Sequence, residues 1–338
     1  MITIKEMAEM IGVSTTTISN VIHGKTGEVS QSTVDKVQKM LEECDYIPNI
    51  SARNLAQNKS KIIGIAMRTR SDKYENLLAD PFFGELLGAV EKTVRANGYF
   101  MMMYISDDIN EIIHYVSTWN IDGLLLVGMV SDEFIRIRSR YKKPFVLIDS
   151  YYPKDFKNYV NVGLEDSEGM YMMTNYLFSM GHKKIGIVTD NLEGVDYYRY
   201  QGYERAMQEH GFTDADENII LFRPAEEERE ESLREIYNLR DKYTVFACMS
   251  DYYAVLLMDY MMDQGISIPD DISITGFDNN MVGKMMRPRL TTIRQDVEEK
   301  GKRAAEALLG MLQDKEVEHD IRLPVELVIQ DSVKKLKD

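Results

Sequence analysis

Residues 3–24 read TIKEMAEMIGVSTTTISNVIHG and decide how the N-terminal part of the chain folds. Thr3 and Glu6 have the spacing of a capping box, in which a hydroxyl and a carboxylate three residues later cap the first turn of a helix. Gly12 ends that helix because glycine readily adopts positive φ. Ser14 then caps a second helix after a very short turn. Two short helices joined by a sharp corner are typical of a helix-turn-helix unit.

A third helix is predicted to begin after Ser30, with apolar residues at helical spacing. Pro48 interrupts this pattern because a residue that precedes proline avoids the helical conformation. Residues 51–57 are a candidate helix that is too short to be stable alone. We therefore predict a helical head at 1–45 and a hinge or linker at 46–60 that becomes ordered only with a partner.

From Lys61 onward, short apolar segments alternate with amphipathic ones. The predicted strands are 62–67, 99–105, 123–127, 145–148, 185–189, 245–249 and 272–276. The main predicted helices are 82–96, 166–180, 197–210, 252–264 and 297–313. Continuous apolar strands between helices indicate parallel sheets that are covered on both faces. The alternation runs twice, so the predicted fold is a small all-α head followed by an α/β core of two doubly wound halves.

Polar residues stand at the carboxyl ends of several predicted strands. They are Asp149, Asp190, Ser250 with Asp251, and Asp278 with Asn279. Ligands of doubly wound sheets bind outside these ends, so a polar ligand site is predicted there. The alternative for Asp149 and Asp251 is that each only caps the helix that follows.

Charge and cysteine content narrow the class of protein. The net charge is −15 over 338 residues, yet the first 61 residues carry seven basic and seven acidic side chains. A neutral head on an acidic body suggests two modules with different partners. With only two cysteines, no signal peptide pattern and no apolar run of membrane length, we expect a cytoplasmic protein with no membrane partner.

Enzyme signatures are missing from the sequence. No G-x-G-x-x-G follows the first predicted strand, and neither a P-loop lysine nor a G-x-S-x-G elbow occurs. The five histidines include no pair at metal-binding spacing. We therefore expect no enzymatic activity, no cofactor and no metal site.

The chain resembles the lactose-repressor (LacI/GalR) family of bacterial transcription regulators over essentially its full length. The helix-turn-helix quoted above and YIPNISARNLA at 46–56 are similar to that family's DNA-binding head and hinge helix. Further landmarks of its effector-sensing core follow in the same order: FVLID, GHKKIGIV, RYQGYERAM, SDYYAV, PDDISITGFDN and PRLTTIRQD. Each segment is a weak signal alone, and the shared order carries the resemblance.

The resemblance implies a core at 61–338 built from two subdomains that resemble periplasmic binding proteins. The expected N-subdomain is about 61–160 plus 292–323, and the expected C-subdomain is about 161–291 plus 324–338. The chain would cross between them near Asn161, Thr292 and Pro324. Members of the family are usually dimers or tetramers. This chain stops without an added heptad helix, so we expect a homodimer.

The helix-turn-helix predicts which residues face DNA. The first residues of a recognition helix lie at base edges in the major groove, which points to Thr15, Thr16 and Asn20 as base-reading residues. The predicted phosphate contacts are Ser14, Thr17, Tyr46 and Asn49. By the resemblance, Leu55 would wedge between base pairs in the minor groove. The alternative is that the threonines only flank a helix cap and that Leu55 packs on the core.

Matching the landmarks of the core also predicts effector-binding residues. Arg199 and Asp278 are expected to face the cleft between the subdomains, with Asp149 as a second carboxylate and Phe82 or Phe83 as an apolar wall. Weaker candidates are Asp251, Asn279 and Gln295. Arg199 and Asp278 could instead pair with each other across the cleft.

These observations favour a transcriptional repressor that binds a palindromic operator as a dimer and is switched by a small molecule. A sugar that releases the DNA is the favoured effector, and a purine corepressor is the alternative. A second class, a cytoplasmic solute-binding protein that does not act on DNA, is disfavoured by the helix-turn-helix head.

Overall fold

The computed structural model describes residues 2–22, 24–46, 59–69, 76–129, 131–150 and 159–337. It divides the chain into two compact units, Met1–Ser60 and Lys61–Asp338, called the head and the core below. No helix among the described residues is both long and apolar enough to span a membrane.

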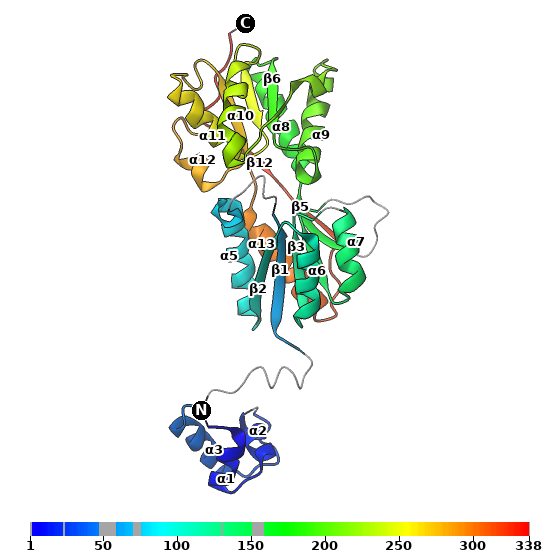
Figure 1. The fold of residues 1–338 in the computed structure, drawn as a ribbon, viewed down its shortest axis with the longest axis vertical. Coiled ribbons are helices and arrows are strands. Elements are labelled where there is room, and N and C mark those ends of the chain that lie inside the picture. The colour runs from blue at the N-terminus through cyan, green and yellow to red at the C-terminus, as the bar shows by residue number, and fades with distance from the viewer. Residues whose placement is uncertain are drawn as a thin grey trace. The chain divides into compact units, whose positions relative to one another are not determined.

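The head is a bundle of three short helices around a small apolar centre (Figure 1). They are α1 (Ile4–Ile11), α2 (Thr15–Ile22) and α3 (Gln31–Glu43). The predicted capping box is confirmed, because the Thr3 hydroxyl accepts from the Glu6 amide and the Glu6 carboxylate accepts from the Thr3 amide. Gly12 ends α1 at φ 70°, a left-handed conformation that favours glycine. Met7 and Ile18 fill the centre, so α1 and α2 are held at a fixed corner.

The first lobe of the core is built on a six-stranded parallel sheet. Its strands, in spatial order, are β11 (Asp320–Leu323), β5 (Val160–Leu164), β4 (Phe145–Ile148), β3 (Gly123–Val127), β1 (Ile62–Arg68) and β2 (Phe100–Ser106). The helices that pack on it are α5 (Pro81–Ala96), α6 (Ile109–Thr118), α7 (Ser131–Arg140) and α13 (Val297–Met311). A short 3₁₀ turn, η1 (Leu77–Ala79), precedes α5.

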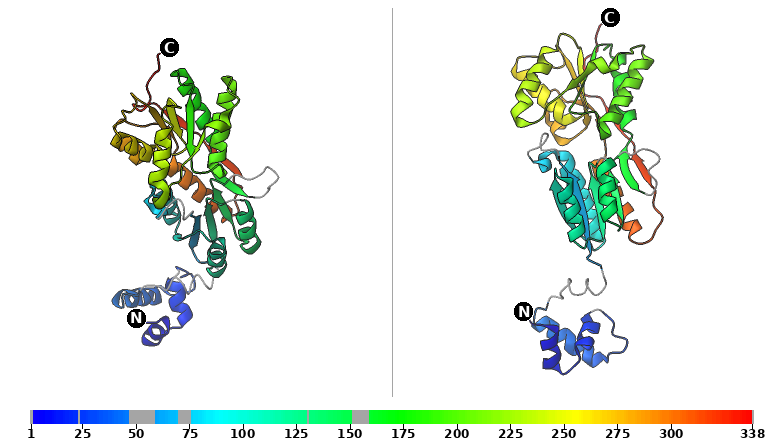
Figure 2. Two further views of the ribbon diagram at one scale, coloured as in Figure 1. Left: turned by 45° about the horizontal axis from the view of Figure 1, so that its top comes forward. Right: turned by 45° about the vertical axis from the view of Figure 1, so that its right-hand side comes forward.

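Alternation along the strands explains why helices cover both faces of this sheet (Figure 2). Ile63 and Ile65 of β1 pack in one apolar cluster with α5 and α13. Ala66, the next residue after Ile65, packs in a different cluster with α6. Successive side chains of a strand point to opposite faces. β3 and β4 in the middle of the sheet are apolar at every position for this reason, as the sequence predicts for a doubly covered sheet.

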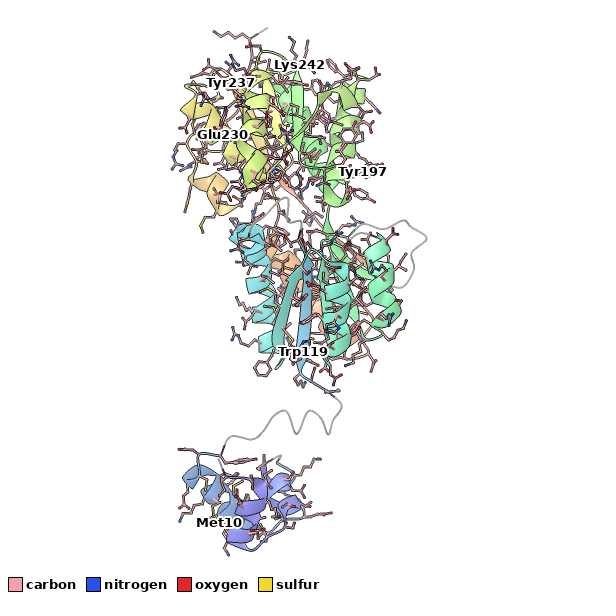
Figure 3. The ribbon with its side chains drawn as sticks, in the orientation of Figure 1. Met10, Trp119, Tyr197, Glu230, Tyr237 and Lys242 are labelled. Carbon is pink, nitrogen blue, oxygen red and sulfur yellow. The ribbon has the colours of Figure 1, made fainter. Side chains whose placement is uncertain are left out.

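The second lobe repeats the arrangement. Its strands, in spatial order, are β12 (Glu326–Val328), β10 (Thr291–Arg294), β9 (Ser273–Asp278), β8 (Val245–Cys248), β6 (Ile185–Thr189) and β7 (Ile219–Leu221). Only β12 runs antiparallel to its neighbour. Its helical elements are α8 (Asp166–Ser179), α9 (Gly194–Glu209), η2 (Ala215–Asn218), α10 (Glu226–Asn238), α11 (Asp251–Asp263) and α12 (Met281–Met285). Large side chains such as Trp119 in the first lobe and Tyr197 in the second remain at the surface (Figure 3).

The chain passes between the lobes three times, after β5, after β10 and between β11 and β12. Asn161 and Gly163 lie inside β5 of the first sheet, so the chain leaves this sheet only after Leu164. The polar Asn161 does not end the strand because its buried side chain accepts a hydrogen bond from the Ser150 amide. Likewise, Thr292 lies inside β10 of the second sheet, and the return follows Arg294. The last passage falls between β11 and β12.

Helices α8 and α9 approach each other closely at Gly202, which gives a stability prediction. A Cβ atom at this position would lie 1.9 Å from the backbone oxygen of Ser167 and 2.9 Å from the backbone nitrogen of Tyr171. Because backbone atoms cannot move aside as a side chain can, Gly202→Ala should lower the free energy of unfolding by at least about 2 kcal/mol. Urea denaturation measures this loss. Gln208→Ala on the exposed side of α9 is the control and should change stability by less than about 0.5 kcal/mol.

Candidate functional site

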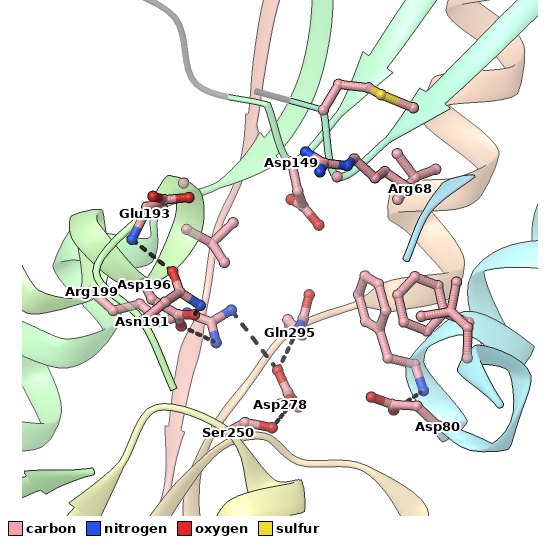
Figure 4. A pocket seen from close by; sticks show the side chains of 18 of the residues that line it. Arg68, Asp80, Asp149, Asn191, Glu193, Asp196, Arg199, Ser250, Asp278 and Gln295 are labelled. Carbon is pink, nitrogen blue, oxygen red and sulfur yellow. Dashed lines mark hydrogen bonds and ion pairs between the residues drawn. The ribbon is translucent and has the colours of Figure 1, made fainter. Parts of the chain in front are cut away.

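A cavity of about 280 Å³ lies in the core where the carboxyl ends of strands from both sheets meet (Figure 4). First-lobe residues that line it follow β1, β3 and β4 or belong to the start of α5, and second-lobe residues come from the start of α9 and the ends of β8 and β9. Its polar lining residues are Arg68, Asp80, Asp149, Asn191, Glu193, Asp196, Arg199, Ser250, Asp278 and Gln295. The position agrees with the general rule for ligand sites in doubly wound sheets.

Arg199 is the buried cation of the second-lobe wall. Its Nε atom donates to Asp166 Oδ1 at 2.9 Å, and its Nη1 atom donates to the Met249 carbonyl oxygen at 2.5 Å. The guanidinium also lies 3.8 Å from the centre of the Phe277 ring. Burial opposes the charged form, but the surrounding carboxylates outweigh it and raise the pKa of Arg199 above its ordinary value. The guanidinium is therefore fixed in place before any ligand arrives.

Asp278 is the carboxylate that faces Arg199 across 4.0 Å, from Oδ1 to Nη2. Its oxygens also accept hydrogen bonds from Gln295 Nε2 at 2.5 Å and from Ser250 Oγ at 3.3 Å. The residue has φ 126°, a conformation that side chains rarely adopt, and such strain is typical of functional sites. Burial raises the pKa of Asp278 to about 7, while Arg199 works in the opposite direction.

Lys300 links the two walls of the cavity through hydrogen bonds to residues that line it. Its ammonium donates to both carboxylate oxygens of Asp149, at 2.8 and 2.7 Å, and to Gln295 Oε1 at 2.9 Å. Lys300 is only 1% exposed. Gln295, on the segment between β10 and α13, thus bonds Asp278 in the second lobe with one end and Lys300 in the first lobe with the other. One polar chain therefore connects the strand ends of both lobes.

The raised pKa of Asp278 predicts how stability depends on pH. The folded protein keeps this proton up to about pH 7, whereas the unfolded chain loses it near 3.8. Between these values the folded state binds more protons, so this group's contribution to stability falls as pH rises. We expect the stability difference between wild type and Asp278→Asn to shift against wild type from pH 4 to pH 7. Urea denaturation of both proteins at each pH measures it, and a pH-independent difference would contradict the assignment.

Most of the effector-binding residues expected from the sequence come together in this cavity. They are Phe82, Phe83, Asp149, Arg199, Asp278 and Gln295. The two phenylalanine rings pack edge to face with centroids 5.1 Å apart and form the apolar wall. Arg199 and Asp278 face each other and also line the cavity. Pairing with each other and contact with a ligand are therefore compatible roles for these two residues.

Asp251 and Asn279 do not line the cavity. Asp251 is fully buried, where its carboxylate accepts from the Thr292 hydroxyl at 2.6 Å and from the Asn280 amide at 2.9 Å. It therefore holds the start of α11 to neighbouring segments of the second lobe. Asn279 lines a separate surface depression beside Lys284. Ser250, the neighbour of Asp251, caps α11 and faces the cavity in its place.

Several lining residues were not predicted from the sequence. The unforeseen polar ones are Arg68, Asp80, Asn191, Glu193 and Asp196, and Lys300 stands behind Asp149. Asn191 and Asp196 could have been found, because Asn191 follows the end of β6 and Asp196 stands one helical turn before Arg199. Lys300 has no such signal, since it lies in the charged run EEKGKR, which is typical of an exposed helix.

The head places the predicted DNA-contacting residues at the start of α2. Thr15 and Thr16 are exposed, and Asn20 is partly exposed one turn later. Ser14 caps α2 by accepting from the Thr17 amide at 3.0 Å, and the two hydroxyls lie 2.8 Å apart. Tyr46 packs against the apolar centre of the head. Asn49 and Leu55 lie outside the described residues.

In the described part of the chain, no group of three or more His, Cys, Asp or Glu side chains is arranged to hold a metal ion.

Comparison with protein families identifies both parts of the chain. Residues 3–49 match the model for bacterial regulatory proteins of the lacI family, and residues 174–333 match the periplasmic binding protein-like domain. The HTH-type transcriptional repressor PurR of Vibrio vulnificus (strain CMCP6) is 34% identical over 353 residues, which cover 99% of this chain and 100% of that protein. The HTH-type transcriptional regulator GalR of Escherichia coli (strain K12) is 30% identical, covering 92% of this chain and 89% of that protein.

Solved structures share the fold at lower sequence identity. The lac repressor dimer bound to operator and the anti-inducer ONPF has a TM-score of 0.85 at 21% identity, covering 98% of this chain and 99% of that chain. A ribose-bound regulator from Enterococcus faecium has a TM-score of 0.71 at 23% identity, covering 82% of this chain and 100% of that chain. With these matches along its full length, the chain belongs to the lacI family of bacterial regulatory proteins.

Proposed function

We propose that the protein is a transcriptional repressor that binds a palindromic operator as a homodimer and releases it when a small sugar occupies the core. The observation that carries the proposal is the convergence of Arg199, Asp278 and Asp149 on one cavity between two lobes, in a chain that begins with a helix-turn-helix. A ligand that prefers one arrangement of the lobes shifts their equilibrium by its difference in affinity for the two arrangements.

The DNA-binding half of the proposal rests on the start of α2. Exposed Thr15 and Thr16 offer hydroxyl and methyl groups, and Asn20 offers an amide suited to adenine. The Ser14 and Thr17 hydroxyls form a hydrogen bond with each other at the start of α2. A hydroxyl that contacts phosphate would therefore also take part in capping this helix. Asn49 and Leu55 stay proposals from the family resemblance.

The homodimer is supported by exposed apolar residues on one side of the core. Strand β2 is the edge of its sheet, and its Phe100 and Met103 are 62% and 38% exposed. On the second lobe, Met281 and Met285 of α12 are 55% and 70% exposed. In Figure 1, β2 of the first lobe and α12 of the second lobe both lie toward the left of the core. Unpaired edges and contiguous apolar surface are typical of protein–protein contacts.

The effector class follows from the lining of the cavity. Carboxylates, an amide and a guanidinium that is already fixed in place are the partners that ligand hydroxyl groups require, which favours a sugar. A purine corepressor is the second candidate. It is favoured by the Phe82 and Phe83 rings, which could stack on a base, and by the identity to PurR proteins.

Selection from random DNA tests the proposal. Full-length protein should enrich an inverted repeat, since a two-fold dimer binds two equal half-sites. The double variant Thr15→Ala/Thr16→Ala should bind the enriched sequence at least about tenfold more weakly, because base contacts contribute roughly 1–3 kcal/mol each. Gln31→Ala, on the exposed start of α3, is the matched control in the head. Failure to enrich any sequence would contradict the DNA-binding proposal.

A further inference from the structure

Gln295 stands at a point where the chain passes from the second lobe back to the first. It extends the pairing of β10 with β9, because its backbone amide donates to the Asp278 carbonyl oxygen at 3.3 Å. Helix α13 begins two residues later, and this helix packs on the sheet of the first lobe. The Gln295 side chain is therefore placed where bonds to both lobes can fix their arrangement.

The two ends of the Gln295 side chain bond to different lobes. Its Nε2 atom donates to Asp278 Oδ1 at 2.5 Å in the second lobe (Figure 4). Its Oε1 atom accepts from Lys300 Nζ at 2.9 Å in the first lobe. An ammonium group can only donate, so the amide oxygen must face Lys300 and the amide nitrogen must face Asp278. One neutral side chain thus joins the carboxyl group of one lobe to the cation of the other.

Lys300 anchors the first-lobe end of this chain of bonds. Its three N–H donors have three acceptors, which are both carboxylate oxygens of Asp149 and Oε1 of Gln295. The ammonium also lies 5.1 Å from the centre of the Phe82 ring at the start of α5. Lys300 and Gln295 are both buried. Because water cannot easily replace a lost partner there, breaking one of these bonds leaves a buried polar group unsatisfied.

We propose that Asp278, Gln295, Lys300 and Asp149 form a latch that holds the two lobes in the arrangement described here. The two ends of the latch belong to different sheets, so a change in the angle between the lobes strains the bond between Gln295 and Lys300. Removing the latch shifts the population toward other arrangements of the lobes. The inference goes beyond the proposed function, because it concerns the lobes themselves and is tested without sugar or operator.

Two variants break the latch at different ends. Gln295→Met keeps a side chain of similar length and removes both of its hydrogen bonds, while the ion pair of Lys300 and Asp149 remains. Lys300→Met combined with Asp149→Asn removes the first-lobe end and leaves Gln295 bonded to Asp278. Either change should raise the population of other lobe arrangements at least about tenfold, the usual effect of losing a hydrogen bond to a charged group.

A third variant exchanges the bonding groups instead of removing them. Gln295→Glu combined with Asp278→Asn places a carboxylate beside Lys300 and an amide that can donate to this carboxylate from position 278. Both bonds and the net charge are kept, so this variant should behave like wild type. Gln208→Met, on the exposed side of α9, is the control for replacing glutamine by methionine.

Double electron–electron resonance measures the distance between the lobes in the full-length protein. Spin labels would be attached at Thr118→Cys in the first lobe and Glu230→Cys in the second, since both positions are exposed. Cys44→Ser removes the partly exposed native thiol, and Cys248 is buried. An excess of unlabelled protein keeps a single labelled subunit in each dimer. We expect a narrow distance distribution for wild type, the control and the exchange variant, and a second distance or a broader distribution for both latch-breaking variants.

Hydrogen exchange on the same proteins distinguishes a latch from local damage. If the lobes move, the latch-breaking variants should exchange faster at all three crossings, which are 164–166, 294–297 and 323–326. Faster exchange confined to 294–297, with an unchanged distance between the lobes, would overturn the latch and leave Gln295 a structural residue beside β10. An exchange variant that behaves like Gln295→Met would also contradict it, since the two bonds would then not be what holds the lobes.

Discussion

Lys300→Met will lower the free energy of unfolding of the core by about 3–5 kcal/mol, the usual effect of removing one partner of a buried ion pair. Lys300 is 1% exposed, and its three hydrogen bonds all go to Asp149 and Gln295. The substitution leaves the Asp149 carboxylate buried beside an apolar side chain. Burial already raises the pKa of Asp149, and the lysine is the main group that opposes this.

A double variant separates the ion pair from simple packing. Lys300→Met combined with Asp149→Asn removes both charges and should recover part of the loss, because an uncharged pair of similar size can replace a buried ion pair and asparagine tolerates the φ of 52° at this position. Urea denaturation of wild type, both single variants and the double variant measures the coupling. A loss below about 1 kcal/mol in Lys300→Met, or a double variant less stable than either single one, would contradict the pairing.

At pH 8, where the Asp278 carboxylate is ionised, Asp278→Asn will weaken effector binding by roughly 10- to 150-fold, because hydrogen bonds to a charged group contribute about 1.5–3 kcal/mol. Asp278 is aligned by Ser250 and Gln295 and faces the cavity beside Arg199. Asparagine keeps the shape of the side chain and removes its charge, so the lobes should still fold. Calorimetry measures the change with a sugar that binds the full-length protein in a thermal-shift screen. Glu230→Gln is the control, and equal affinities of Asp278→Asn and wild type would remove Asp278 from the site.

The fold was predictable from sequence wherever one pattern decides it. The capping box at Thr3, the glycine at position 12 and the fully apolar strands each have one local explanation, and the structure confirms them. The ends of β5 and β10 were not predictable, because polar side chains inside them form hydrogen bonds with other segments of the chain. The Asn161 side chain bonds Ser150, and the Thr292 hydroxyl bonds Asp251.

The lining of the cavity was predictable where the family landmarks point to it, as for Arg199 and Asp278. It was not predictable where neighbours in sequence take opposite roles. Ser250 faces the cavity and Asp251 turns into the core, a choice set by how α11 starts after β8. Lys300 shows the limit most clearly, because its partner Asp149 is 151 residues away in sequence. Only the packing of α13 on the first sheet brings them together.

Operator binding with and without effector tests the central claim most directly. Fluorescence anisotropy would titrate the full-length protein onto the selected inverted repeat at fixed salt, with the sugar absent or at about 100 times its Kd. Coupling between two sites is usually worth 5- to 150-fold, so we predict that the sugar raises the operator Kd at least fivefold. An operator Kd that stays the same at saturating sugar would contradict the account, because the cavity would then not control the DNA-binding head.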